Sequence, residues 1–134
     1  MGNLPSQDIP PTEDLRMEMH GGYLEAHILG KYTLSRFKRQ LAAIAGACQA
    51  WEVTRLLLNW TALRGSLRTT DRYELGTQGA SLLKSLKVAS YLRPDLLDPG
   101  KFGELVGRNR GLQVQTFTDR ETALAWLLEP GKRS

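Results

Sequence analysis

The sequence predicts an α/β domain with a mostly parallel five-stranded sheet, an antiparallel strand at its N-terminal end and four main helices. Three observations predict this fold. Two alternating segments come first, separated by a Gly-Gly dipeptide that is typical of a hairpin. Strand-like and helix-like patterns then alternate along the chain. Two helix-capping patterns open later helices, and right-handed crossovers between the later strands make them parallel.

The first two strands are expected over residues 15–20 and 23–29, with Gly21-Gly22 as a two-residue loop. This loop fixes the register, because each residue of one strand then faces a residue of the other at a known count from the turn. The expected pairs are His20 with Tyr23, Met19 with Leu24, Met17 with Ala26, and Leu15 with Ile28. The opposite face carries Arg16, Glu18, His20, Tyr23, Glu25 and His27. On that face Glu18 is directly opposite Glu25, a like-charge pair that requires solvent.

The third strand is expected at Arg55–Asn59, where three consecutive leucines indicate burial on both faces. Leu57 and Leu58 should both be largely buried. A helix from about residue 33 or 35 to residue 50 precedes this strand. Its apolar positions recur at helical spacing, and they are Leu34, Phe37, Leu41, Ile44, Ala45 and Cys48.

The second half of the chain is expected to form three further helices and two strands. Asp71 and Glu74 match a capping box, with Asp71 as N-cap of a helix that ends near Leu83. Its apolar residues are Leu75, Leu82 and Leu83. Gly76 and Gly79 either weaken this helix or permit close packing against a neighbouring strand. Residues 86–92 and 112–117 are the remaining strands. Asp98-Pro99 opens the helix between them, and a second capping box at residues 118–121 opens the last helix, which Pro130 closes. Polar positions in the outer strands place the helices mainly on one face.

Length and composition restrict the class of protein. The 134 residues suit a single domain over residues 14–129, with flexible tails at residues 1–13 and 130–134. The formal net charge is +4, but the basic residues are dispersed, which favours solvated faces over nucleic-acid binding. No apolar run approaches the roughly 20 residues of a membrane span. The single cysteine, Cys48, is typical of buried packing and of a reducing cytoplasm.

The candidate site is the segment at residues 59–72, which follows the buried third strand and is called the candidate loop below. Such strand ends gather ligand and regulatory sites in α/β sheets. A helix N-terminus and nearby arginines favour a phosphate or a phosphorylated hydroxyl. The alternative is that Thr69, Thr70 and Asp71 only cap the helix. The candidate residues are Asn59, Trp60, Arg64, Ser66, Arg68, Thr69, Thr70 and Arg72.

No catalytic, cofactor or metal site is predicted. The chain shows no Ser/His/Asp arrangement, no glycine-rich phosphate loop and no Cys/His cluster. The two histidines, His20 and His27, share the outer hairpin face with Glu18 and Glu25, but their spacing is not that of a tight ligand motif.

Several segments resemble the STAS domains, and specifically the bacterial SpoIIAA-like proteins. They are GKYT at residues 30–33, RLLLN at residues 55–59, FGELVGRNRG at residues 102–111, VQTFTD at residues 114–119 and ALAWL at residues 123–127. The resemblance implies a fold of repeated β–α turns and a non-catalytic regulatory or interaction module in the cytoplasm. Founding members are anti-sigma factor antagonists, phosphorylated on a serine within an Asp-Ser-Ser-Gly-like stretch. The corresponding residues 66–71 do not keep that stretch.

Two kinds of partner therefore stay open. The module would contact a protein partner, or a second copy of the chain, through the candidate loop. The alternative is a carrier or sensor of a small apolar or anionic ligand, as the related CRAL-TRIO lipid carriers suggest. An enclosed apolar pocket would favour the carrier, and a flat exposed apolar patch would favour the module.

Overall fold

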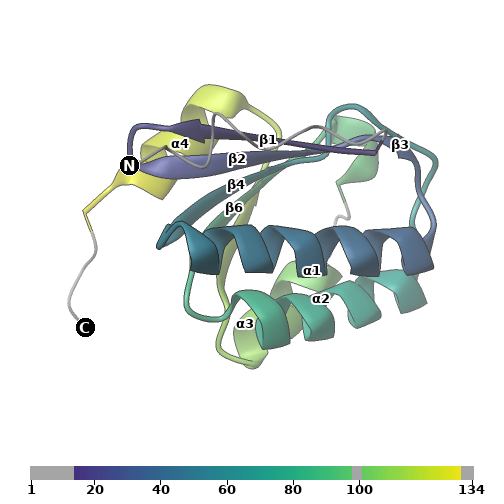
Figure 1. Ribbon diagram of the computed structural model, residues 1–134. Helices are drawn as coiled ribbons and strands as arrows, with labels where there is room; N and C mark the ends of the chain where they lie inside the picture. Colours follow the sequence, from purple (N-terminus) through teal and green to yellow (C-terminus); the bar gives the residue numbers. More distant parts are fainter. Residues whose placement is uncertain (1–13, 98–100, 131–134) are drawn as a thin grey trace.

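The structure of the protein, a computed structural model, describes residues 14–97 and 101–130 (Figure 1). The expected tails, apart from Pro130, lie outside the described residues, and so does the Asp98-Pro99 helix start. Within the described residues no helix is both long and apolar enough to cross a membrane.

A five-stranded sheet forms the centre of the domain. Its strands are β1 (Leu15–His20), β2 (Tyr23–Ile28), β4 (Arg55–Asn59), β6 (Lys87–Tyr91) and β7 (Gln113–Phe117), in the spatial order β1-β2-β4-β6-β7. The β1–β2 pair is antiparallel and the other pairs are parallel, as predicted. Two short strands that were not predicted, β3 (Gly30–Lys31) and β5 (Leu63–Arg64), pair separately beside this sheet.

The helices cover the two faces of the sheet unequally. They are α1 (Leu34–Ala50), α2 (Thr69–Leu83), α3 (Phe102–Asn109) and α4 (Arg120–Leu128), with a short 3₁₀ turn, η2 (Pro94–Leu96). Figure 1 shows α1, α2 and α3 on one side of the sheet and α4 on the other. The expectation that the helices lie mainly on one face is therefore confirmed for three of the four.

The hairpin has the predicted register, with His20 opposite Tyr23 and Leu15 opposite Ile28. Glu18 is opposite Glu25, but the expectation that this pair is solvated was wrong. The Glu25 side chain is 1% exposed. Its burial is possible because Arg120, at the start of α4, reaches across the sheet and pairs with it.

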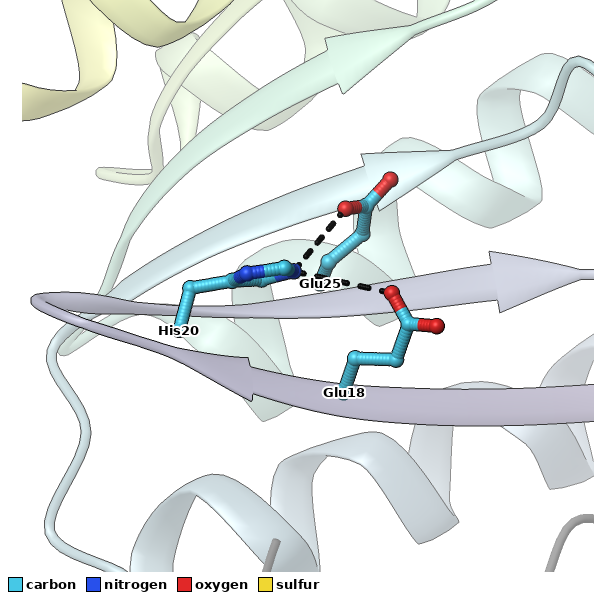
Figure 2. A group of neighbouring side chains, drawn as sticks. All are labelled: Glu18, His20 and Glu25. Carbon is cyan, nitrogen blue, oxygen red and sulfur yellow. Dashed lines mark ion pairs between the residues drawn. The ribbon is translucent and has the colours of Figure 1, made fainter.

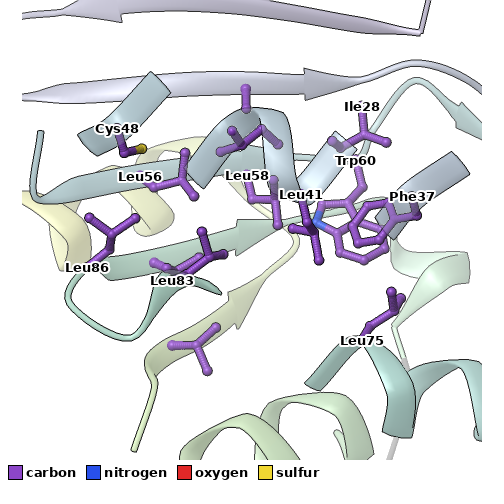
Figure 3. Packing of buried hydrophobic residues seen from close by; sticks show 14 of the residues in the cluster. Ile28, Phe37, Leu41, Cys48, Leu56, Leu58, Trp60, Leu75, Leu83 and Leu86 are labelled. Atoms are coloured by element: carbon purple, nitrogen blue, oxygen red, sulfur yellow. The ribbon is translucent and has the colours of Figure 1, made fainter. Parts of the chain in front are cut away.

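The central strand is buried on both faces, as its three leucines predict. Leu56 and Leu58 belong to the large apolar core beneath α1 and α2, part of which Figure 3 shows. Leu57 is 0% exposed and belongs to a smaller core on the opposite face. The other fully buried members of this smaller core include Ala89, Ala123 and Leu127.

Both predicted capping boxes are displaced along the chain. The N-cap of α2 is Arg68, so the helix begins at Thr69, and Asp71 sits in its first turn. There the Asp71 carboxylate accepts a hydrogen bond from the Arg68 backbone N–H at 3.3 Å, which satisfies an otherwise unpaired donor. Glu74 pairs instead with Lys38 of α1, at 3.0 Å.

The last helix shows a displacement of one residue. Asp119, not Thr118, is its N-cap, and the Asp119 carboxylate accepts the Thr122 backbone N–H at 2.8 Å. A carboxylate caps a helix as effectively as a hydroxyl does. Because Thr and Asp are neighbours here, the sequence leaves the first residue of the helix uncertain by one position.

Two expectations about α2 need correction. Leu82 is 37% exposed and does not join the core. Gly76 allows close packing, but against helix α3 and not against a strand. A Cβ atom on Gly76 would lie 2.7 Å from the Gly103 carbonyl oxygen and 2.8 Å from the Val106 Cβ. A glycine is therefore required where the two helices meet.

Candidate functional site

At the end of β4, the side chains of two consecutive residues of the candidate loop lie on opposite faces of the sheet. Asn59 is buried on the α4 side, where its amide Nδ2 donates to Glu25 Oε2 at 2.9 Å. Trp60 is 9% exposed and packs in the large core on the α1 side. Successive side chains of a strand alternate in direction, so these two candidate residues do not form one site.

Most of the other candidate residues lie on the surface. Arg64, Ser66, Arg68, Thr69 and Thr70 are all exposed. The Arg68 side chain is 81% exposed and its guanidinium is 3.5 Å from the Asp71 carboxylate. A phosphate or partner contact at this surface stays a prediction.

An apolar cavity of about 110 Å³ lies between the sheet and helices α1 to α3. The candidate residues Trp60 and Arg72 both line it, and Leu67 of the candidate loop does so too. The remaining walls are mostly leucine, valine and glycine. They comprise Phe37, Leu41, Leu58, Leu75, Gly76, Gly79, Leu83, Val88, Leu92, Leu96, Leu97, Gly103, Leu112 and Val114.

The Trp60 indole contributes an unusual polar group to this apolar region. Its ring packs against Phe37, with ring centroids 4.7 Å apart (Figure 3). The indole Nε1 is buried and has no hydrogen-bond acceptor in the described part of the chain. An unpaired buried donor costs free energy, so an acceptor brought to this N–H by a bound molecule would be stabilised.

Polar side chains line the cavity from helices α2 and α3 and from the sheet. Arg72 and the exposed Lys101 line it, together with Ser90, Thr116 and Glu104. Glu104 is held in place, because its Oε1 accepts the Thr116 backbone N–H at 2.8 Å and its side chain is 7% exposed. The two basic residues are the groups on the cavity wall suited to an anionic end of a ligand.

A second polar arrangement lies on the other face of the sheet, around Glu25. Arg120 donates to both carboxylate oxygens, at 2.6 and 2.7 Å, and Asn59 donates to one of them. Burial raises the pKa of Glu25, but the hydrogen bonds from Arg120 and Asn59 outweigh it and hold the pKa at about 2. Glu25 is therefore a buried, ionised carboxylate with a fixed orientation.

Both histidines of the described chain surround this carboxylate. Glu18, His20, Glu25 and His27 are called the hairpin cluster below. Figure 2 shows the His20 ring between the Glu18 and Glu25 carboxylates. Its Nε2 is 3.5 Å from Glu18 Oε1 and 3.2 Å from Glu25 Oε1. On the neighbouring strand, His27 Nε2 donates to Glu18 Oε1 at 3.2 Å.

The sequence already placed these four side chains on one hairpin face, but it could not show how close they come. The decisive groups are Arg120 and Asn59, because they allow Glu25 to be buried and ionised. The parallel order of β2 and β4 places Asn59 next to His27. This strand pairing was the one sequence feature that could have placed Asn59 near the cluster. No short-range pattern placed Arg120 there.

The arrangement of elements defines a SpoIIAA-like, or STAS-like, α/β fold. The chain is similar to the crystal structure of an anti-sigma factor antagonist from Mycobacterium paratuberculosis, with 14% identity and a TM-score of 0.59. That alignment covers 84% of this chain and 92% of the other. It is also similar to an uncharacterised DUF3478 protein with a SpoIIAA-like fold from Shewanella loihica PV-4, with 22% identity and a TM-score of 0.51. Here 84% of this chain and 91% of the other are covered.

No protein-family model matches the chain, and no curated protein matches it either. The structural similarity, at these identities, confirms the fold that the sequence resemblance implies.

Proposed function

We propose that the domain is a non-enzymatic regulatory module that senses a small, largely apolar ligand in the helix-side cavity. The observation that carries this proposal is the cavity itself, a space of about 110 Å³ with predominantly apolar walls. Concave sites lined mainly by apolar side chains, with a few polar groups, are the usual binding sites of small molecules. The similarity to an anti-sigma factor antagonist supports a regulatory role over a catalytic one.

The walls indicate the chemistry of the ligand. The apolar side chains suit an aliphatic or aromatic body, while Arg72 and Lys101 suit an acidic end. The buried Trp60 Nε1–H adds a donor that has no acceptor among residues 14–97 and 101–130. A short-chain or aromatic carboxylic acid combines these features, and a long lipid exceeds the volume.

The cavity and the candidate loop are physically connected. Leu67 and Arg72 belong to the loop and also line the cavity, and α2 begins between them. A ligand that contacts Leu67 and Arg72 therefore changes the position or mobility of the exposed residues beside them. This is how the module would report its ligand to a protein partner at the surface formed by Arg68, Thr69 and Thr70.

The test is an NMR titration of the ¹⁵N-labelled protein with hexanoate and benzoate, with hexanol as the uncharged comparison. The Trp60 indole N–H resonance, assigned through Trp60→Phe, should move on titration. The indole resonances of Trp51 and Trp126, which do not line the cavity, should stay in place. Binding of the acids in preference to the alcohol is expected from Arg72 and Lys101.

A cavity-filling variant provides the control. Ser90 lies in β6 and lines the cavity, so Ser90→Leu should abolish the Trp60 shift while circular dichroism shows a folded domain. Equal shifts at all three indoles, or an unchanged titration in Ser90→Leu, would contradict ligand binding at this cavity.

A further inference from the structure

The hairpin cluster lies on the sheet face opposite the cavity, and the proposed function does not use it. Three of its side chains, Glu18, His20 and Glu25, bring one ligand-type atom each to within 4.8 Å of one another. They come from two adjacent strands of a rigid hairpin, so their relative positions are set by the strand register. We propose that this cluster is a binding site for a divalent transition metal, with Zn²⁺ as the best-fitting ion.

The two distances from His20 to the carboxylates fit a tetrahedral ion, and the third pair of donor atoms lies within 4.8 Å. Zinc bonds of about 2.0–2.2 Å to nitrogen and oxygen place tetrahedral ligand atoms roughly 3.3–3.6 Å apart. His20 Nε2 is 3.2 Å from Glu25 Oε1 and 3.5 Å from Glu18 Oε1. Ordinary side-chain adjustment suffices to bring these three atoms around one ion.

The surroundings of the His20 Nε2 suit a metal ligand. This atom is buried and makes no hydrogen bond to any described residue, although two carboxylate oxygens lie within 3.5 Å. The ring is also held by stacking on Tyr23, with centroids 4.7 Å apart and an interplanar angle of 18°. In the neutral tautomer with its proton on Nδ1, the ring directs the Nε2 lone pair toward the two carboxylates.

The remaining contacts are those expected around metal ligands. Arg120 and Asn59 occupy three of the four acceptor positions of the Glu25 carboxylate, and the fourth, on Oε1, is next to His20. His27 donates to Glu18 Oε1, and Arg16 lies 3.6 Å from Glu18 Oε2. Such outer contacts orient ligating carboxylates. His27 is thus a positioning residue, and water completes the coordination of the ion.

A donor set of one imidazole and two carboxylates favours some metal ions over others. This donor set suits zinc, and also copper, nickel or iron, better than magnesium or calcium, which take oxygen ligands alone. The donor spacing and the absence of sulfur ligands in the cluster favour a four-coordinate zinc site with one exchangeable position.

The test is calorimetric titration of the full chain with ZnCl₂ at pH 7.5, after removal of metals by dialysis against EDTA. We expect one ion per chain with a dissociation constant in the micromolar range or below. His20→Ala and Glu18→Gln should each weaken binding at least tenfold. The surface variant Glu74→Gln, whose carboxylate pairs with Lys38 away from the cluster, is the matched control and should bind as the original chain does.

A further readout separates a defined site from nonspecific binding. Co²⁺ in place of Zn²⁺ should give the visible absorption of a four-coordinate ion. Glu18 is 43% exposed, so Glu18→Gln remains informative if His20→Ala fails to fold. Binding no tighter than millimolar, or binding that both variants leave unchanged, would overturn the proposal.

Discussion

The same strands form both faces of the sheet, but the two faces differ in the side chains they carry and in how completely these are packed. The face under α1, α2 and α3 is apolar and incompletely filled, with a cavity of about 110 Å³. The face beneath α4 has a small apolar core, and beside it a network of charged side chains around Glu25. A cavity weakens packing but offers space, whereas a buried ion pair fixes geometry at a cost in desolvation. We therefore expect ligand exchange on the first face and rigid positioning on the second.

The largest effect should come from the ion pair on the α4 face. Arg120→Ala leaves Glu25 buried without its main partner, and breaking such a pair costs about 3–5 kcal/mol of unfolding free energy. Urea denaturation measures the loss. Lys38→Ala is the matched control, because both members of the Lys38–Glu74 pair are 38% exposed, and such surface pairs contribute about 1 kcal/mol or less. Equal losses in the two variants would show that the α4 face does not depend on this pair.

The second prediction compares the two apolar cores through neighbouring leucines of β4. Leu57 packs toward α4 and Leu58 toward the cavity side, and they are 0% and 5% exposed. Each change to alanine should cost about 2–5 kcal/mol of unfolding free energy. Denaturant melts of both variants give the comparison. If only Leu58→Ala is costly, the small core beneath α4 contributes little to stability.

The third prediction concerns pH and the α4 face. The pKa of Glu25 falls from its ordinary 4.5 to about 2 in the folded state, so its stabilising effect is complete above pH 4.5. It is lost as the pH falls from 4.5 toward 2, because the unfolded chain takes up the proton first. The loss should be roughly 3 kcal/mol. Glu25→Gln should remove this part of the acid dependence, and an unchanged acid profile in that variant would contradict it.

The smallest effect tests the helix contact beside the cavity. Gly76→Ala places a methyl group 2.7 Å from the Gly103 carbonyl oxygen, and such overpacking costs about 1–3 kcal/mol. Gly46→Ala in α1 is the matched substitution, because nothing lies within 4 Å of its added Cβ. There alanine should stabilise the domain by up to about 1 kcal/mol through helix propensity. Thermal melts that shift in the same direction for both variants would contradict close α2–α3 packing.

The parts of the fold that were predictable depend on short-range rules. A two-residue loop fixes which hairpin residues face each other, so the pairing of His20 with Tyr23 followed from counting. Three leucines in a row required cover on both faces, and Leu57 and Leu58 have it. Helix starts were predicted less well, because Asp71 and Asp119 can satisfy backbone donors from more than one position.

The site depends on relations that the sequence does not display. Arg120 and Asn59, which contact Glu25, are 95 and 34 positions away from it in the sequence. No local pattern therefore indicates that Glu25 is buried and charged. The cavity depends on how the side chains of three helices fail to fill the space over Ser90 and Val88, which composition alone does not reveal. The candidate loop does begin where β4 ends, yet the side chains of Asn59 and Trp60 lie on opposite faces of the sheet.

The Glu25–Arg120 ion pair also constrains the order in which parts of the domain fold. Glu25 belongs to β2, while Arg120 opens α4, 95 positions further along the chain. During translation the hairpin emerges with a carboxylate that has no cationic partner from α4, so it stays hydrated and the outer face of the sheet stays open. Contacts of such long sequence separation form late and slowly. The Glu25–Arg120 ion pair therefore forms only after α4 has been synthesised and has packed on the sheet.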